Sequence, residues 1–244
     1  MGGSLMRVFS VLGALFPAWG LADTSLVYDE SGQTNVLRIA GGKMRFDNHA
    51  NRNWFLYDAG RQAVIIVDPA RQEFSLLDEK TVAELRRTYE SLSQQVSSQV
   101  AMLPPAWRQQ MEQIAGRALP SSSPRDSLSL QSTDRRAQAA GHSCAVFQLL
   151  QKGKPRSEIC LISATQLGLP EADLATVRRW GGFSRALAAE ARGYLILDEE
   201  VFGRGDQLPL MYRVRLKGNP GVLTDIHHQG IDPRLMEVPA GYRQ

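Results

Sequence analysis

The fold is decided by residues 25–77, which read SLVYDESGQTNVLRIAGGKMRFDNHANRNWFLYDAGRQAVIIVDPARQEFSLL. In this stretch short apolar runs are separated by turn signals, and the period of a helix is absent. Runs of this length joined by tight turns predict six antiparallel strands that follow one another in a meander. The turn signals are Ser31-Gly32, Gly41-Gly42, Ala59-Gly60 and Asp68-Pro69.

A helical period begins directly after this stretch. Asp78 is a suitable N-cap, and Pro104-Pro105 ends the run because proline lacks the amide hydrogen that a helix needs. The pattern predicts one long helix whose stripe, with Leu92 at its middle, packs on the sheet; a membrane-surface helix is the alternative. A second, short helix is predicted at Ala106–Ala115. The apolar residues of the long stripe are Val82, Leu85, Tyr89, Leu92, Val96, Val100 and Leu103.

The second half of the chain carries weaker signals. Residues 119–140 are rich in Ser, Gln, Asp and Arg, which predicts a mobile loop with a short strand at Leu128–Leu130. The later elements are expected to be a hairpin of Cys144–Leu150 and Ser157–Leu161, a helix from Glu171 to about Ala191, and strands at Met211–Leu216 and Val222–His227.

Two adjacent glycines interrupt this later helix, in the sequence Trp180-Gly181-Gly182-Phe183. Each glycine destabilises a helix by about 1 kcal/mol relative to alanine, so a break or a kink is expected. Close packing against a neighbour is one explanation for the pair. A gate over a cavity is the other.

The two cysteines, Cys144 and Cys160, lie in opposite arms of the expected hairpin. A register centred on Lys152 places them directly opposite each other, within disulfide reach. A redox or metal-binding pair is the alternative, but the chain has no Cys-x-x-Cys spacing and two thiolates alone do not form a structural zinc site. The sequence therefore predicts a structural disulfide in an exported protein.

Residues 1–22 have the pattern of a signal peptide. Arg7 precedes an apolar stretch from Val8 to Trp19, and Gly20-Leu21-Ala22 supplies small residues for cleavage. A transmembrane anchor is the alternative, but it needs about 20 apolar residues and this stretch is shorter and contains Pro17. The chain is therefore expected to be periplasmic, with no transmembrane anchor once the leader is removed.

Composition and histidine placement argue against several classes of protein. The net charge is +3, from 28 basic and 25 acidic residues that are scattered along the chain, so a nucleic-acid partner is not expected. The histidines are His49, His142, His227 and His228, and the last two point to opposite faces of one strand. Asp198-Glu199-Glu200 is expected to be a solvated turn. No cofactor, metal site or catalytic residue is predicted, and the protein is expected not to be an enzyme.

Two arginines form a local conflict in the first half of the chain. If Gly41-Gly42 form a two-residue turn, Arg38 directly faces Arg45, and like charges in facing positions are unfavourable. Either the carboxylate of Asp29 or that of another strand residue lies between them, or both side chains extend into water. The functional alternative is a bound anion, such as a lipid headgroup or the carboxylate of a partner.

Several segments carry a resemblance to a known family: residues 37–46 (LRIAGGKMRF), Tyr57-Asp58, Val67-Asp68-Pro69 and residues 236–242 (MEVPAGY). With them the chain resembles the LolA/LolB-like periplasmic lipoprotein carriers, and is more similar still to an uncharacterised family of exported proteins with that fold. The resemblance implies a single domain, residues 23–244, of the α+β class. Its antiparallel curved sheet, an incomplete β-barrel, would hold helices on its concave face and leave an apolar cavity.

The function expected from this resemblance is non-enzymatic binding of an apolar ligand, a lipid or a lipoprotein acyl chain, in the groove between sheet and helices. An envelope protein-interaction or stress-sensing module, with the groove filled by the helices, is the alternative, and a hydrolase is the third. The residues expected to contact the ligand are Arg38, Arg45, Trp54, Ile65, Phe74 and Leu92.

Overall fold

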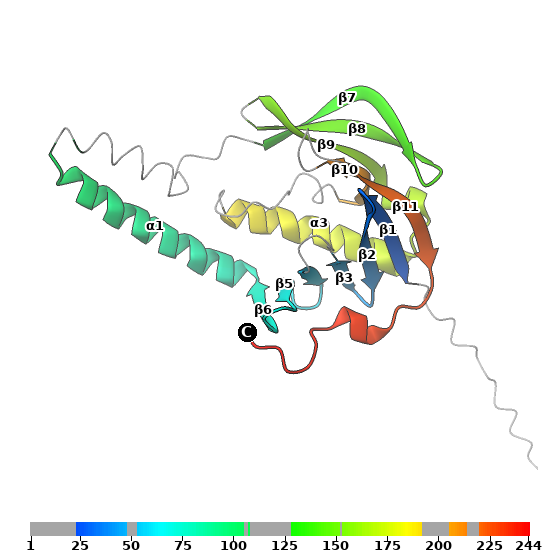
Figure 1. The fold of residues 1–244 in the computed structure, drawn as a ribbon, viewed down its shortest axis with the longest axis horizontal. Helices are drawn as coiled ribbons and strands as arrows, with labels where there is room; N and C mark the ends of the chain where they lie inside the picture. The colour runs from blue at the N-terminus through cyan, green and yellow to red at the C-terminus, as the bar shows by residue number, and fades with distance from the viewer. Residues whose placement is uncertain are drawn as a thin grey trace, which may run out of the picture.

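The computed structural model describes residues 23–47, 53–104, 107, 128–151, 153–191, 205–213 and 220–244. Within these residues one sheet of 11 strands has the order β6-β5-β4-β3-β2-β1-β11-β10-β9-β8-β7, and all neighbouring strands are antiparallel. The sheet is curved (Figure 1). It is also open, because β6 and β7 are its two edge strands. The prediction of an α+β fold with an incomplete barrel is confirmed at this level.

The first six strands follow each other along the chain, as the sequence predicts. Gly41 and Gly42 have φ values of +56° and +75°, which is the left-handed backbone that a two-residue hairpin turn requires. This turn fixes the register that pairs Arg38 with Arg45. The strands are β1 (Thr24–Glu30), β2 (Gln33–Ala40), β3 (Lys43–Asp47), β4 (Trp54–Asp58), β5 (Ala63–Asp68) and β6 (Glu73–Leu77).

The second half of the sheet contains a strand that is much longer than the sequence indicated. The short strand predicted at Leu128–Leu130 is the start of a 12-residue edge strand, so the loop expected to follow it up to residue 140 is wrong; residues 119–127 lie outside the described part of the chain. This edge strand has a bulge between Ser132 and Arg136. The strands are β7 (Leu128–Ala139), β8 (His142–Gln151), β9 (Lys154–Ser163), β10 (Gln207–Arg213) and β11 (Gly221–His228).

Helix α1 (Glu79–Ala101) begins at the predicted N-cap, where the Asp78 carboxylate accepts a hydrogen bond of 2.7 Å from the Thr81 amide. The pKa of Asp78 is lowered, first by the side-chain hydrogen bond of Thr81 and then by this backbone bond. Only the start of α1 lies near the sheet, beside β6, and the rest extends away from it (Figure 1). Val82 is buried but Leu92 is 44% exposed, so the prediction that the whole stripe packs on the sheet is wrong.

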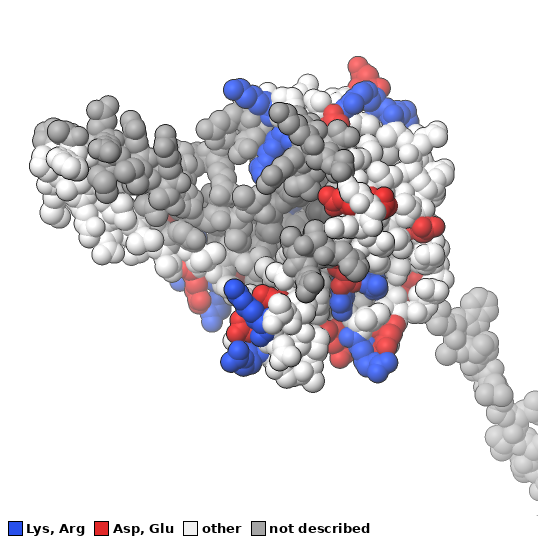
Figure 2. Space-filling view, in the orientation of Figure 1, with Lys and Arg blue, Asp and Glu red and all other residues white. Residues whose placement is uncertain are grey.

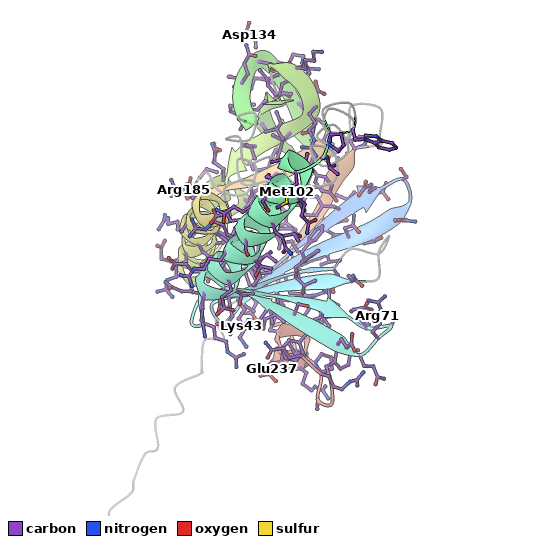
Figure 3. The ribbon with its side chains drawn as sticks, turned by 90° about the vertical axis from the view of Figure 1, so that its left-hand side faces the viewer. Lys43, Arg71, Met102, Asp134, Arg185 and Glu237 are labelled. Carbon is purple, nitrogen blue, oxygen red and sulfur yellow. A yellow bond between two sulfur atoms is a disulfide. The ribbon has the colours of Figure 1, made fainter. Side chains whose placement is uncertain are left out.

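Helix α3 (Glu171–Ala191) lies across the concave face of the sheet (Figure 1). Its buried residues Leu174 and Val177 join Leu26, Ile39 and other residues from both halves of the sheet in the largest hydrophobic cluster. α1 packs beside α3 (Figure 3). Val82 of α1 and Leu187 of α3 form a small, separate hydrophobic cluster there. Among the described residues, no helix is both long enough and apolar enough to span a membrane.

The two glycines do not break α3, which is continuous over 21 residues. A Cβ at Gly181 would lie 3.0 Å from the carbonyl oxygen of Gly205, so this position needs a glycine for close packing. A Cβ at Gly182 would meet no atom within 4 Å. The expected kink is therefore wrong, and close packing explains the first glycine only.

The predicted disulfide joins Cys144 and Cys160, whose Cα atoms are 5.5 Å apart. The predicted register is wrong, however, because Cys160 faces Val146 rather than Cys144. A register shift between Leu149 and Leu150 moves the two arms relative to each other, and the disulfide joins diagonal neighbours. Two strands are thus fixed to each other at the end of the sheet opposite β6.

The convex face of the first half-sheet is covered by the C-terminal segment, residues 229–244, which contains the short helix η2 (Pro233–Met236). Met236 is buried there against β4 and β5. At the end of the chain Arg243 forms a parallel bridge with Glu73, so the segment also lies along the β6 edge. The residues in this second cluster are Ala40, Trp54, Leu56, Ile65, Val67 and Met236, with Phe74, Leu76, Ile231, Val238 and Tyr242 partly buried beside them.

Candidate functional site

An open pocket of about 300 Å³ lies where three elements meet: the β4–β5 turn, the start of α1 and the middle of α3. The three elements are far apart in the sequence, and each supplies residues that line the pocket. The sheet, α1 and α3 thus meet at one concave site. The lining residues are Tyr57, Ala59, Gln62, Glu79, Arg179, Gly182, Phe183, Ala186 and Leu187.

Aromatic and aliphatic side chains form the inner wall of this pocket. Tyr57 on β4 contacts two rings of α3, with centroid distances of 5.1 Å to Trp180 and 5.3 Å to Phe183. Leu187, one turn further along α3, is buried. Gly182 faces open space, so α3 presents no side chain there. The inner wall is therefore apolar and has free volume beside it.

The rim of the pocket is polar and carries one charge of each sign. Glu79 is the first residue of α1, and Arg179 is exposed on α3. Within the described part of the chain, Arg179 makes no ion pair. Its neighbour Arg178 points elsewhere and binds Glu171 at 3.1 Å, while Arg185 donates to the carbonyl of Gly181 at 3.0 Å.

The pKa of Tyr57 shows that one of the two rim charges, Arg179, acts on this side chain. Burial raises the pKa of the Tyr57 hydroxyl, the positive charge of Arg179 lowers it, and the carboxylate of Asp58 raises it further. Arg179 therefore acts on the polar end of Tyr57 from the rim. A negative charge that entered the pocket near this hydroxyl would be stabilised by the same arginine.

A second apolar feature lies on the concave face, in a row of facing residues on β2 to β5. The row runs Leu37, Phe46, Phe55 and Ile66, each paired with the next across neighbouring strands. Phe55 is 40% exposed, although Phe46 and Ile66 on either side pack against the main core. We call these four residues the concave row. It leaves apolar surface open beside the part of the sheet that α3 covers.

The structure does not bring the predicted ligand residues together in one pocket. Trp54, Ile65 and Phe74 lie on the convex face, against the C-terminal segment, and Leu92 lies on α1. Successive side chains of a strand point to opposite faces of the sheet. A prediction that is wrong by one residue along the strand therefore places the side chain on the wrong face. Phe55, the next residue along, is the one that faces the concave side.

Arg38 and Arg45 also lie on the convex face, and a carboxylate lies between them. It belongs to Asp47 rather than Asp29: Asp47 pairs with Arg38, and with Arg45 at 2.7 Å. Arg45 also lies 3.8 Å above the centre of the Trp54 ring and donates to the carbonyl of Leu235 at 2.6 Å. Arg45 thus helps to hold the C-terminal segment on the sheet, and both arginines are paired with Asp47 within the chain.

Two of the four histidines lie on β11, and His49 falls outside the described residues. The Nδ1 atom of His228 lies 3.5 Å from the hydroxyl of Thr24. In the described ranges no group of three metal-binding side chains is close enough to hold an ion. The acidic run at residues 198–200 is also outside the described part of the chain.

One buried carboxylate was not identified from the sequence. Asp173, in the first turn of α3, is only 4% exposed, and its Oδ2 atom has no hydrogen-bond partner. Burial raises the pKa of Asp173 to about 6, the hydrogen bonds of Thr24 and the charge of His228 lower it, and Asp23 raises it. An acidic residue in a first helical turn is usually exposed there, so the sequence carries no signal of this burial.

Among the described residues on the face in Figure 2, basic and acidic side chains are intermixed. Within the described ranges, the pocket and the concave row are the features that suggest a ligand. Comparison of the chain with protein-family models, with curated proteins and with solved structures finds no match.

Proposed function

We propose that this protein binds the apolar part of an amphiphilic ligand, such as a lipid or the acyl chain of a lipoprotein, between the sheet and α3, without catalysing a reaction. The observation that carries the proposal is the pocket beside Phe183 and Leu187, which combines an apolar wall with a polar rim. Ligand sites in proteins commonly have this composition.

The size and surroundings of the pocket support a chain-shaped ligand. Its volume of about 300 Å³ is at the lower end of the range for small-molecule sites, enough for one narrow apolar segment. The concave row offers further apolar surface on the same face of the sheet. Transport of such a ligand through the periplasm, as in the LolA/LolB-like carriers that the sequence resembles, is the cellular role we propose.

Native mass spectrometry of the full chain tests the proposal, because a bound lipid adds a defined mass. Gly182→Leu should remove the adduct, since a side chain at this position has room to enter the pocket. Ala172→Leu, at an exposed position of α3 that does not line the pocket, is the matched control and should keep it. An adduct retained in Gly182→Leu would contradict the proposed site.

A second candidate function, binding of another envelope protein, is favoured by the far end of α1. Met102 is 81% exposed and Trp107 is 63% exposed, and large apolar side chains gather at interaction surfaces more than elsewhere. Figure 3 shows Met102 at the end of α1 that lies away from β6. A photoreactive amino acid at Met102 should cross-link to one defined protein in cells, whereas the same group at exposed Gln131 on β7 should not.

A further inference from the structure

We propose that the pocket selects amphiphiles with a single carboxylate head over neutral or cationic ones, and that Arg179 is the residue that binds this head. The inference rests on the proposed function and adds the charge of the ligand to it. It is argued from the rim residues and their partners.

Arg179 is placed to meet a ligand rather than a neighbour. It lines the pocket from the exposed side of α3, and no carboxylate of the described residues forms an ion pair with it. A guanidinium binds a carboxylate through two parallel hydrogen bonds, which fixes the orientation of the head. Phe183 is four residues further along α3 and therefore lies beside the part of the ligand's apolar chain that follows its carboxylate head.

The effect of Arg179 on Tyr57 supports this placement. The arginine lowers the pKa of the buried hydroxyl, against the larger effect of burial, so its field reaches the wall of the pocket. The Tyr57 hydroxyl can in turn donate a hydrogen bond to a carboxylate held at the rim. One cation and one neutral donor make a suitable pair for a monoanion.

Glu79 limits the charge that the pocket accepts. It lines the same rim as Arg179, so a ligand with two negative charges would meet one attractive and one repulsive group. The N-terminus of the 23-residue helix α1 partly offsets the charge of Glu79, since helix N-termini favour anions. A carboxylate therefore suits the rim better than a phosphate dianion.

Displacement of an apolar fluorescent dye tests the inference with three probes of equal chain length: dodecanoate, dodecanol and dodecylamine, each below its micelle concentration. The wild-type chain should bind dodecanoate about tenfold more tightly than dodecanol, the lower end of the range for a hydrogen bond to a charged group. Arg179→Gln should bind the two equally. Arg178→Gln is the control, because Arg178 is adjacent but paired with Glu171, and it should keep the preference.

The outcomes separate this inference from the proposed function. Equal binding of dodecanoate and dodecanol by the wild-type chain would overturn the role of Arg179 and leave an apolar pocket standing. Tightest binding of dodecylamine would overturn it in favour of Glu79. Loss of the preference in Arg178→Gln as well would show a general effect of surface charge, which also contradicts it. Failure of all three probes to displace the dye would count against the proposed function itself.

Discussion

The two faces of the first half-sheet carry similar apolar side chains, yet they are covered in different ways. On the convex face the C-terminal segment buries Leu56 and Trp54, and polar anchors hold it in place. On the concave face α3 covers Tyr57 but leaves Phe55 exposed and a pocket beside Gly182. The comparison shows that coverage, rather than the chemistry of the strands, separates a structural face from a face available to a ligand.

The strongest test places the same charge on each face. Leu56→Asp should cost more than about 4 kcal/mol of unfolding free energy, because it buries an unpaired carboxylate under the C-terminal segment. Phe55→Asp, the adjacent residue on the concave face, should cost about 1 kcal/mol, since its carboxylate can reach water. Urea unfolding of both variants measures the difference, and equal losses would contradict the comparison.

The next test concerns the C-terminal segment. Met236→Ala should cost about 2–3 kcal/mol, because Met236 is the buried residue of η2 and its truncation leaves a cavity against β4 and β5. Leu235→Ala is the control at the adjacent, exposed position and should change stability by less than about 0.5 kcal/mol. A similar loss of melting temperature in both variants would show that the segment does not seal the convex face.

The third test uses the pH dependence of stability to measure the burial of Asp173 at the start of α3, on the concave face. Its folded pKa, about 6, is above the usual value of 3.8, so the fold favours the protonated form. The contribution of this group to stability therefore decreases as the pH rises from about 4 to 6, and stays low above that. Asp173→Asn should raise the unfolding free energy by about 1–2 kcal/mol at pH 7 and by much less at pH 4.

The matched measurement is urea unfolding of both proteins across this pH range. Asp23 and His228 face Asp173 and are kept in both, so the difference between the two curves isolates the one carboxylate. A gain that does not depend on pH would show that folding does not raise the pKa of Asp173.

The smallest effects are expected at the two glycines of α3, and they should have opposite signs. Gly181→Ala should destabilise the fold by about 1–2 kcal/mol, because its Cβ is forced against the backbone of Gly205. Gly182→Ala should stabilise it by up to about 1 kcal/mol, since alanine favours a helix and the Cβ meets no atom. Thermal melting distinguishes the two, and a loss in both would mean that the pocket side of α3 is more tightly packed.

Much of the fold could be predicted from the sequence because its signals are local. Ser31-Gly32 and Gly41-Gly42 fix the turns that join β1, β2 and β3, and Asp78 marks the start of α1. By contrast, β7 is a polar edge strand with a bulge, so its composition is that of a loop. Edge strands need little apolar surface, which removes the period-two signal.

The candidate site was harder to predict, for two physical reasons. Residues 54–57 (WFLY) and 64–67 (VIIV) are apolar on both faces, so they contain no alternation from which the concave side could be identified. Arg179 and Glu79 reach the pocket from different helices, and their proximity depends on how α1 and α3 pack. The register of the arginine pair and a strand carboxylate between the two side chains could both be predicted, but the sequence did not single out Asp47 as that carboxylate.

The pairing of β1 with β11 has a consequence for the order of folding. Thr24 and His228 are neighbours in the sheet although 204 residues separate them in the chain. The hairpins on either side form from adjacent segments and can pair early, whereas this central contact requires almost the entire polypeptide. Non-local pairing of this kind is associated with slow folding. Before β11 has been synthesised, any sheet that the first half of the chain forms is therefore open at β1, and this central edge stays exposed until the last strand arrives.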